Sequence, residues 1–328
     1  MTGGAGFIGA HLVERLLELG AIVRVIDDLS TATLDALNPL LERQPERLRF
    51  VRGSILDDDA LGDAFSRASL VFHCAALSSI PRSVEHPERS WAVNTTGTLR
   101  VLLAARDAAV RRVVYSASSS AYGNTPGLPK AETHTPAPVS PYGASKLAAE
   151  HLCVAFSETY GLSTVSLRYF NVFGPRQRPD TPYAGVIPSF ASRVLGGEAP
   201  RIFGDGEQSR DFTFVDNAVL ANLLAATSDR PLAGEVYNTA TGSRVTVNEL
   251  AERVIAKLGP GPAAQPIEIE RIEPRPGEVR HSHADISRIT NDLGYEPIAT
   301  FDQGLDVTLD WYRAWHERTA KTSNGGVR

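Results

Sequence analysis

The sequence predicts an α/β fold in which helices cover a doubly wound, mostly parallel sheet, with a second and smaller domain attached. Two observations support this prediction. The first half of the chain alternates short runs rich in β-branched residues with helical stretches. A glycine-rich loop also stands directly before the first of these helices. Because parallel strands are buried on both faces, they read as continuous apolar runs, which are found at residues 22–26, 48–51, 70–75, 113–116 and 165–170.

The stretches between these runs are expected to be helices. They cover residues 11–19, 57–67, 93–108 and 142–160. The last of them has clear boundary signals, because Pro141 stands at its first turn and Gly161 just past its end.

From about Val172 the pattern changes, because prolines break the chain into shorter elements. We therefore expect a Rossmann-type domain at residues 1–171 and a smaller α+β substrate domain at residues 172–316. The connections should interleave, since residues 211–226 and 236–238 could still pack on the first domain. Residues 317–328 are polar and are expected to form a disordered tail.

Composition excludes several classes of protein. The net charge of −5 argues against a nucleic-acid surface. No run approaches the ~18 apolar residues of a membrane span, and the chain opens on a glycine loop instead of a signal segment. Cys74 and Cys153 lie in apolar runs and are expected to be buried thiols in a reducing compartment. The sequence thus predicts a cytoplasmic protein.

His281 and His283 alternate without a third ligand, so no metal site is expected.

The segment from Thr2 to Gly9, TGGAGFIG, has the features of a dinucleotide-binding loop. Glycines at positions 3, 6 and 9 let the backbone turn tightly, approach a pyrophosphate and pack the helix close to the sheet. A glycine loop alone is weak evidence, because such loops also serve as plain turns.

Asp27 strengthens the prediction of a dinucleotide site. It ends the run 22–26 and lies eighteen residues after Gly9, near the ~20 expected of the acidic residue that binds the adenosine ribose. A carboxylate there would accept hydrogen bonds from both ribose hydroxyls and repel a 2′-phosphate, so NAD is favoured over NADP. The alternative is a turn or cap residue, a role that Asp28 could equally fill.

A fold of this type requires a strand before the glycine loop, and the numbering begins immediately before Thr2. Three alternatives are open: upstream residues are absent from this chain, the start is misassigned, or the strand is reduced to a stub.

Tyr142 and Lys146 stand four residues apart on one face of a helix, and Ser118 follows a strand. Oxidation of an alcohol needs a base near neutral pH, whereas free tyrosine titrates near ~10. Lowering the tyrosine pKa to about 7 takes roughly 4 kcal/mol, within reach of an adjacent ammonium and a positive nicotinamide ring. Lys146 would supply the ammonium and Ser118 a hydrogen bond that orients the substrate. An ordinary surface pair of tyrosine and lysine is the alternative.

Together these motifs resemble the extended short-chain dehydrogenase/reductases, and within them the NAD-dependent UDP-hexose 4-epimerases. The resemblance runs from Thr2 to about Tyr312. It rests on the glycine loop, Asp27, Ala75-Ala76, Asn94, Ser118, Tyr142-xxx-Lys146, the segment 168–175, Gly204-Asp205-Gly206, Ser209-Arg210-Asp211-Phe212 and the segment 275–282.

The resemblance implies roles for further residues. NAD would contact Gly3, Gly6, Phe7, Ile8, Gly9, Asp27, Ser54, Ile55, Ala75, Ala76, Asn94, Tyr142, Lys146 and Tyr169. The UDP-sugar would contact Ser79, Ser118, Ser119, Ser120, Asn171, Val186, Arg210, Arg275, Glu278 and Ser282. The two arginines would pair with the diphosphate, where bidentate geometry is apt. Ser54 departs from the family, which usually has aspartate there, so weaker adenine anchoring is expected.

The sequence therefore predicts an isomerase with tightly bound NAD that interconverts the C4 configuration of a UDP-hexose through a 4-keto sugar. The substrate pair would be UDP-GlcNAc/UDP-GalNAc, UDP-Glc/UDP-Gal, or both, and the helices at 93–108 and 142–160 suggest a homodimer. Open alternatives are a UDP-uronic acid 4-epimerase or decarboxylase, a nucleotide-sugar dehydratase, and a non-catalytic NAD-binding scaffold. Dehydration is disfavoured, because Ser119-Ser120 stand where dehydratases carry Asp-Glu.

Overall fold

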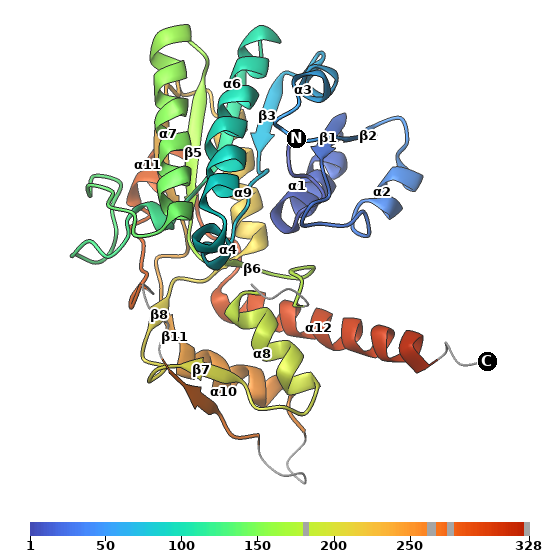
Figure 1. The fold of residues 1–328 in the computed structure, drawn as a ribbon, viewed down its shortest axis with the longest axis vertical. Coiled ribbons are helices and arrows are strands. Elements are labelled where there is room, and N and C mark those ends of the chain that lie inside the picture. Colours follow the sequence, from blue (N-terminus) through green and yellow to red (C-terminus); the bar gives the residue numbers. More distant parts are fainter. Residues whose placement is uncertain (180–183, 261–266, 274–278, 325–328) are drawn as a thin grey trace.

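The computed structural model describes residues 1–179, 184–260, 267–273 and 279–324. Figure 1 shows two stacked bodies: an upper one built around parallel strands, and a lower one made of helices and short strands. Among the described residues, no helix is both long and apolar enough to cross a membrane.

The upper body is built on a parallel sheet. Its larger part has the order β10-β5-β4-β3, and β1 pairs with β2 beside it. Met1 and Thr2 join the two parts: Thr2 forms parallel bridges to Ile26 of β1 and to His73 of β3. These residues thus lie where the strand before the glycine loop is required. The strands are β1 (Val23–Asp27), β2 (Leu48–Arg52), β3 (Leu70–His73), β4 (Arg112–Ser118), β5 (Thr164–Tyr169) and β10 (Glu235–Thr239).

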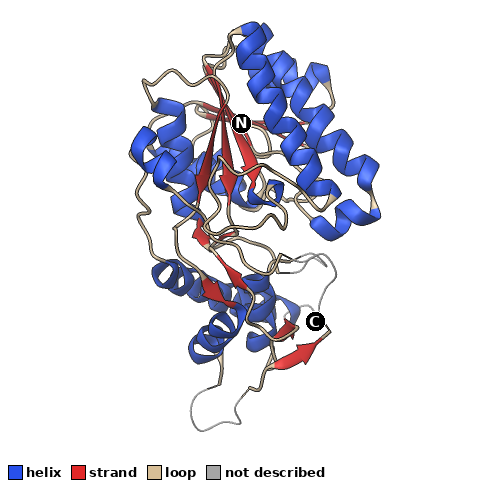
Figure 2. Ribbon diagram, turned by 90° about the vertical axis from the view of Figure 1, so that its left-hand side faces the viewer, coloured by secondary structure: helices blue, strands red, loops and turns tan. Residues whose placement is uncertain are grey.

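Helices cover both faces of this sheet (Figure 2). One face carries α1 (Phe7–Glu18) and α9 (Val215–Thr227), which pack on each other. The other carries α3 (Asp58–Phe65), α6 (Gly97–Asp107) and α7 (Pro141–Tyr160). The predicted doubly wound α/β architecture is confirmed, and the strands lie within a few residues of the apolar runs that predicted them.

The helix expected at 93–108 is present, but it contains a π turn. The π-helix η1 (Ala92–Thr96) leads without a break into α6. Single π turns inside helices are uncommon and frequently mark functional sites. Side-chain periodicity cannot reveal such a turn, because one widened turn barely disturbs the apolar pattern. Sequence reasoning also missed the short helices α2 (Asn38–Arg43), α4 (Ile80–Glu85) and α5 (Pro87–Trp91).

The chain crosses between the bodies more than once. After β5 it forms the lower body, returns through α9 and β10 to the sheet, and leaves again at β11. The elements outside the sheet are β6 (Val172–Phe173), α8 (Val186–Leu195), β7 (Arg201–Phe203), β8 (Ser209–Arg210), β9 (Thr213–Phe214), β11 (Val245–Thr246), α10 (Val247–Leu258), β12 (Glu270–Ile272), α11 (Ser287–Leu293) and α12 (Phe301–Asn324).

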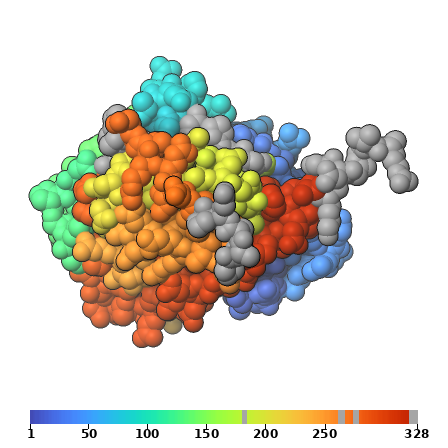
Figure 3. Space-filling model, turned by 90° about the horizontal axis from the view of Figure 1, so that it is seen from below, coloured from blue at the N-terminus to red at the C-terminus, as the bar shows by residue number. Residues whose placement is uncertain are grey.

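The lower body has its own apolar core, formed by buried side chains of α8, α10 and α12. Viewed from below, residues of the C-terminal half cover most of this face (Figure 3). Residues 317–324, expected to belong to a disordered tail, are helical, because α12 continues to Asn324, and residues 325–328 lie outside the described residues. The helix passes beyond its apolar contacts because polar residues alone do not end a helix, and no proline interrupts this stretch.

Candidate active site

The glycine loop lies between the ends of β1 and β3. Gly3 has a φ of +69°, and a Cβ there would stand 2.5 Å from the backbone nitrogen of Ala75. A Cβ at Gly9 would stand 2.1 Å from the carbonyl oxygen of Gly3. Glycine is therefore required at both positions. α1 begins directly after Gly6, and no side chain caps its N-terminus. Those N–H groups and the helix dipole suit a pyrophosphate, so the loop fits a dinucleotide.

Asp27 ends β1 beside this loop. Its Oδ2 accepts a hydrogen bond from Ala5 N at 3.0 Å, and its Oδ1 accepts one from Leu29 N at 2.9 Å. Burial raises the pKa of the carboxyl group, while these backbone N–H groups oppose the shift. The backbone N–H of Gly6 also donates to this carboxylate. A carboxylate has about four lone-pair sites, so Asp27 can still accept a ribose hydroxyl.

Ser54 and Ile55 follow β2 at the same edge of the sheet. The Ser54 hydroxyl accepts a hydrogen bond from Leu56 N at 3.2 Å, so it caps its own turn. Ile55 is buried against Gly97, where a Cβ would stand 2.5 Å from the isoleucine Cδ1.

Asn94 connects several segments around the site from within η1. Its side-chain oxygen accepts from Leu77 N at 2.8 Å, and its Nδ2 donates to Leu77 O at 3.2 Å and to Ser145 Oγ at 3.0 Å. The loop that carries Ala75 and Ala76 is thereby tied to α7. Asn94 thus acts here by holding backbone in place.

Ser118, Tyr142 and Lys146 come together at the carboxyl end of β4. Ser118 is the last residue of that strand, and Tyr142 lies in the first turn of α7. The tyrosine backbone is anchored, because Tyr142 N donates to Ser83 Oγ at 3.1 Å. The lysine follows one turn later, with its side chain almost fully buried.

Burial is the main influence on the electrostatics of this group. Burial raises the pKa of Tyr142, and a hydrogen bond with Ser118 opposes that shift. Burial lowers the pKa of Lys146 to about 8. We expected Lys146 and an oxidised nicotinamide ring together to lower the tyrosine pKa, and that joint effect stays a prediction.

The residues assigned to the sugar lie on several elements. Ser119 and Ser120 form the turn η2 (Ser119–Ala121) after Ser118, and Ser79 caps α4 by accepting from Arg82 N at 3.2 Å. The Ser79 and Ser118 hydroxyls thus both accept from backbone N–H groups.

Asn171 and Ser282 meet across 111 residues of sequence. Asn171 Nδ2 donates to Ser282 Oγ at 3.3 Å and to the Asp211 carbonyl oxygen at 3.2 Å. Asn171 has a φ of +37°, in the left-handed region that asparagine tolerates better than most residues. The structure thus brings together two predicted substrate residues that lie far apart in the sequence.

Three other predicted site residues, Arg210, Val186 and Tyr169, lie on three different elements. Arg210 donates from Nη1 to the carbonyl oxygens of Ser209 and Arg280, each at 3.0 Å. Val186 is half-buried at the start of α8. The Tyr169 hydroxyl accepts from Asn222 Nδ2 at 2.6 Å inside the protein. Arg275 and Glu278 lie outside the described residues.

Sequence reasoning missed residues that support the site. Arg168 on β5 donates to both carboxylate oxygens of Glu150 on α7, at 2.8 and 2.6 Å, in a buried pair. The Asp211 carboxylate accepts from Thr241 N at 3.0 Å and from Ala284 N at 3.2 Å, two residues beyond Ser282. Their only sequence signal was a charged residue within an apolar or motif segment, which does not identify the partner.

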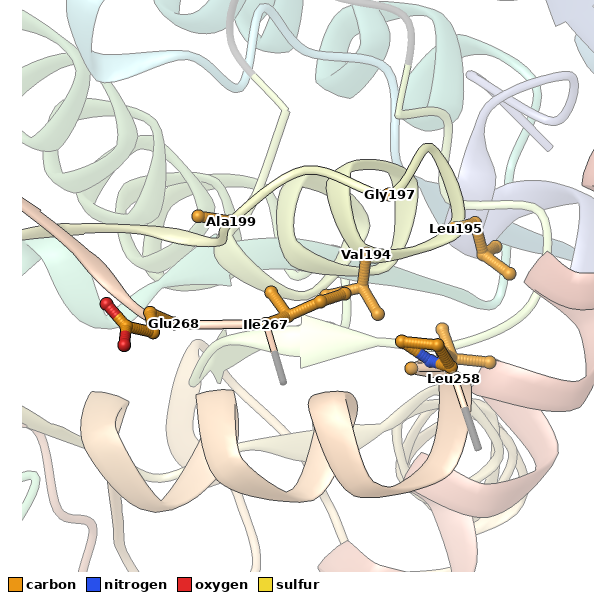
Figure 4. Close-up of a pocket in the computed structure, with 9 residues that line it drawn as sticks. Val194, Leu195, Gly197, Ala199, Leu258, Ile267 and Glu268 are labelled. Atoms are coloured by element: carbon orange, nitrogen blue, oxygen red, sulfur yellow. The ribbon is translucent and has the colours of Figure 1, made fainter. Parts of the chain in front are cut away.

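A separate cavity of about 580 Å³ opens in the lower body, between the C-terminal ends of α8 and α10 (Figure 4). Val194, Leu195, Leu258 and Ile267 line it, with Glu268 at one side. None of the predicted site residues that the structure describes borders it. In the part of the chain that the structure describes, no group of three or more His, Cys, Asp or Glu side chains could hold a metal ion.

Known proteins resemble this chain over nearly its whole length. It is 36% identical over 315 residues to the UDP-glucose 4-epimerase of Mycolicibacterium smegmatis, covering 95% of this chain and 97% of that protein. It is 35% identical over 323 residues to a dTDP-glucose 4,6-dehydratase of an Actinoplanes species, covering 96% of this chain and 97% of that one.

Solved structures agree with this resemblance. The UDP-N-acetylglucosamine 4-epimerase of Methanobrevibacter ruminantium, in complex with UDP-N-acetylmuramic acid, superimposes with a TM-score of 0.88 and 39% identity, covering 96% of this chain and 97% of that one. The UDP-glucose 4-epimerase of Thermus thermophilus, in complex with NAD, gives 0.84 and 35%, covering 95% and 97%.

The family model described as "NAD dependent epimerase/dehydratase family" matches residues 1–240. That match covers the glycine loop, Asp27 and the group of Ser118, Tyr142 and Lys146. The chain therefore belongs to the NAD dependent epimerase/dehydratase family, and its cofactor is NAD.

Proposed function

We propose that the protein is a UDP-hexose 4-epimerase. The observation that supports this most is the meeting of Ser118, Tyr142 and Lys146 at the edge of the sheet next to the NAD loop. NAD, which the glycine loop and Asp27 would hold, would supply the hydride acceptor for oxidation at the sugar C4 and the hydride donor for its reversal. Tyr142 takes the proton of the 4-hydroxyl and gives it back. Ser118 orients that hydroxyl, and Lys146 keeps positive charge beside the tyrosine.

A nucleotide-sugar dehydratase is the second candidate, since a dehydratase is among the relatives. Elimination needs an acid and a base next to the sugar. Ser119 and Ser120 offer hydroxyls there, and the Ser120 backbone N–H is used by Ser118. A hydroxyl cannot replace a carboxyl acid and a carboxylate base, so epimerisation is favoured. Incubation with a panel of UDP-sugars distinguishes the proposed epimerase from a UDP-uronic acid 4-epimerase or decarboxylase and from a non-catalytic scaffold.

A panel of UDP-sugars tests the proposal. The purified protein would be incubated with UDP-GlcNAc, UDP-Glc and UDP-glucuronic acid, and the C4 configuration followed by NMR. We expect at least one neutral UDP-hexose to be converted to its galacto epimer. The sugar should lose neither water nor carbon dioxide. A 4-keto-6-deoxy product would contradict the proposal in favour of dehydration, and absence of turnover with bound NAD would favour a scaffold.

The cofactor preference depends on Asp27. The protein should purify with NAD and turn over without added cofactor, and Asp27→Ala should lower the fraction of bound NAD measured after gel filtration. Asp28→Ala is the matched control, because Asp28 Oδ1 only accepts from Ser30 N in an exposed turn. Equal or tighter binding of NADP by the unmodified protein would contradict the assignment, because a carboxylate should repel the 2′-phosphate.

We further propose that the protein is a homodimer joined through α6 and α7. Half-buried apolar side chains lie on both helices: Leu99 and Leu103 on α6, and Leu147 and Leu152 on α7. The solution mass from light scattering decides this point. The free thiols of Cys74 and Cys153 are in keeping with a proposed cytoplasmic location.

A further inference from the structure

The ammonium group of Lys146 is buried, and it forms no ion pair with any residue that the structure describes. The residue is only 4% exposed. Among the described residues, no carboxylate lies within ion-pairing distance of its Nζ. Glu150, one turn further along α7, is engaged by Arg168 through two hydrogen bonds. An isolated cation at such a place is costly, so the protein must offset that cost by other means.

Tyr115 is the side chain that contacts this ammonium. It lies on β4 and is fully buried. Lys146 Nζ stands 4.5 Å from the centre of its ring, within the range of a cation–π interaction. The Tyr115 hydroxyl also donates to the Lys146 carbonyl oxygen at 3.4 Å. One side chain therefore contacts the lysine at both its backbone and its charge.

The other titratable groups around Lys146 do not neutralise it. On β3, burial lowers the pKa of His73 to about 3, so its imidazole is neutral near pH 7. Burial raises the pKa of Cys74, directly after β3, and of Cys153 on α7, so both are thiols. Tyr142 is a neutral phenol near pH 7, and Glu150 is paired with Arg168.

The choice of an aromatic ring here has a physical reason. A carboxylate would stabilise the ammonium but would cancel its field at Tyr142. An aliphatic side chain would leave the field but would favour loss of the lysine proton. The face of a ring attracts the cation and carries no net charge. We propose that Tyr115 is a positioning residue for Lys146, which holds the ammonium on its ring and leaves the full positive charge available to Tyr142.

This inference rests on the proposed function for its consequence in catalysis, but it can be tested without turnover. The chain has only four lysines, Lys130, Lys146, Lys257 and Lys321. Lysine labelled with carbon-13 at Cε therefore gives few NMR signals, and Lys146→Arg assigns the relevant one. Its chemical shift against pH reports the pKa of Lys146 directly.

Three variants separate the ring from the hydroxyl. Tyr115→Phe keeps the ring, whereas Tyr115→Leu removes it, and Tyr115→Met is a second variant without a ring that fills the space if leucine does not fold. We expect the Lys146 pKa to fall by about half to one pH unit in the leucine and methionine variants. The phenylalanine variant should match the wild type. Lys257, held by Asp306 at 3.0 Å far along the chain, is the internal control and should not move.

Two results would overturn the inference: an unchanged Lys146 pKa in both variants without a ring, or an equal fall in Tyr115→Phe, which would assign the effect to the hydroxyl. The activity profile gives a second readout. Loss of the lysine proton ends activity at high pH, so its alkaline limb should move to lower pH in Tyr115→Leu and not in Tyr115→Phe. If the wild type shows no turnover of any UDP-sugar, the proposed function fails while the NMR titration still decides the role of Tyr115.

Discussion

Replacing Tyr142 with phenylalanine is expected to reduce kcat for UDP-hexose epimerisation by roughly 10²–10⁴-fold, the usual contribution of a general base. The ring is kept, and the backbone anchor from Tyr142 N to Ser83 Oγ does not involve the hydroxyl. Folding and NAD content should therefore be normal. The measurement is the initial rate of epimer formation by NMR, with bound NAD determined on the same sample.

Tyr160→Phe is the matched control for this experiment. Tyr160 is the last residue of the same helix and is 52% exposed, so loss of its hydroxyl should leave the rate unchanged. Near-normal turnover in Tyr142→Phe would contradict the assignment of Tyr142 as the base.

Lys146→Ala should also turn over slowly near pH 7. Its residual rate should rise toward higher pH, because burial raises the Tyr142 pKa and the variant lacks the positive charge that we expect to favour the tyrosinate.

Replacing Ser282 with tyrosine is expected to abolish turnover of N-acetylated UDP-hexoses and to leave the plain hexoses largely unaffected. Ser282 is half-buried and accepts from Asn171 Nδ2 at 3.3 Å, so both lie at one place in the substrate region. The resemblance to UDP-hexose 4-epimerases implies that this position walls the pocket beside the sugar 2-substituent, which stays a prediction. A ring there should overlap an acetamido group, and overpacking of this kind costs about 1–3 kcal/mol or more.

The wild type should accordingly interconvert UDP-GlcNAc and UDP-GalNAc at least as well as UDP-Glc and UDP-Gal. Ser282→Ala is the control, because it keeps the space and removes only the hydroxyl, so both substrate classes should remain active. Kinetics with all four UDP-sugars would be compared among the three proteins. Equal slowing of both classes in Ser282→Tyr, or a wild type inactive on the N-acetylated pair, would show that Ser282 does not control substrate size.

The sequence by itself determined the α/β class, the positions of five strands along the chain, the glycine-rich loop and the family. These features are local or periodic. Buried parallel strands require continuous apolar runs, and the close approach of the loop to Ala75 requires glycine at position 3. The spacing of Tyr142 and Lys146 follows from the helical repeat. Each of these constraints therefore acts on residues that are close together in the sequence, where a pattern can be recognised.

Only the tertiary structure decided which distant groups meet. Asn171 contacts Ser282 across 111 residues, Asp211 holds Ala284, and β10 returns to pair with β5. The structure also showed that the Lys146 charge faces the Tyr115 ring. These contacts depend on how strands and helices pack, and many partners in the sequence would satisfy the same hydrogen bond or ring contact. The topology of the whole fold decides which of those partners lie close together in space.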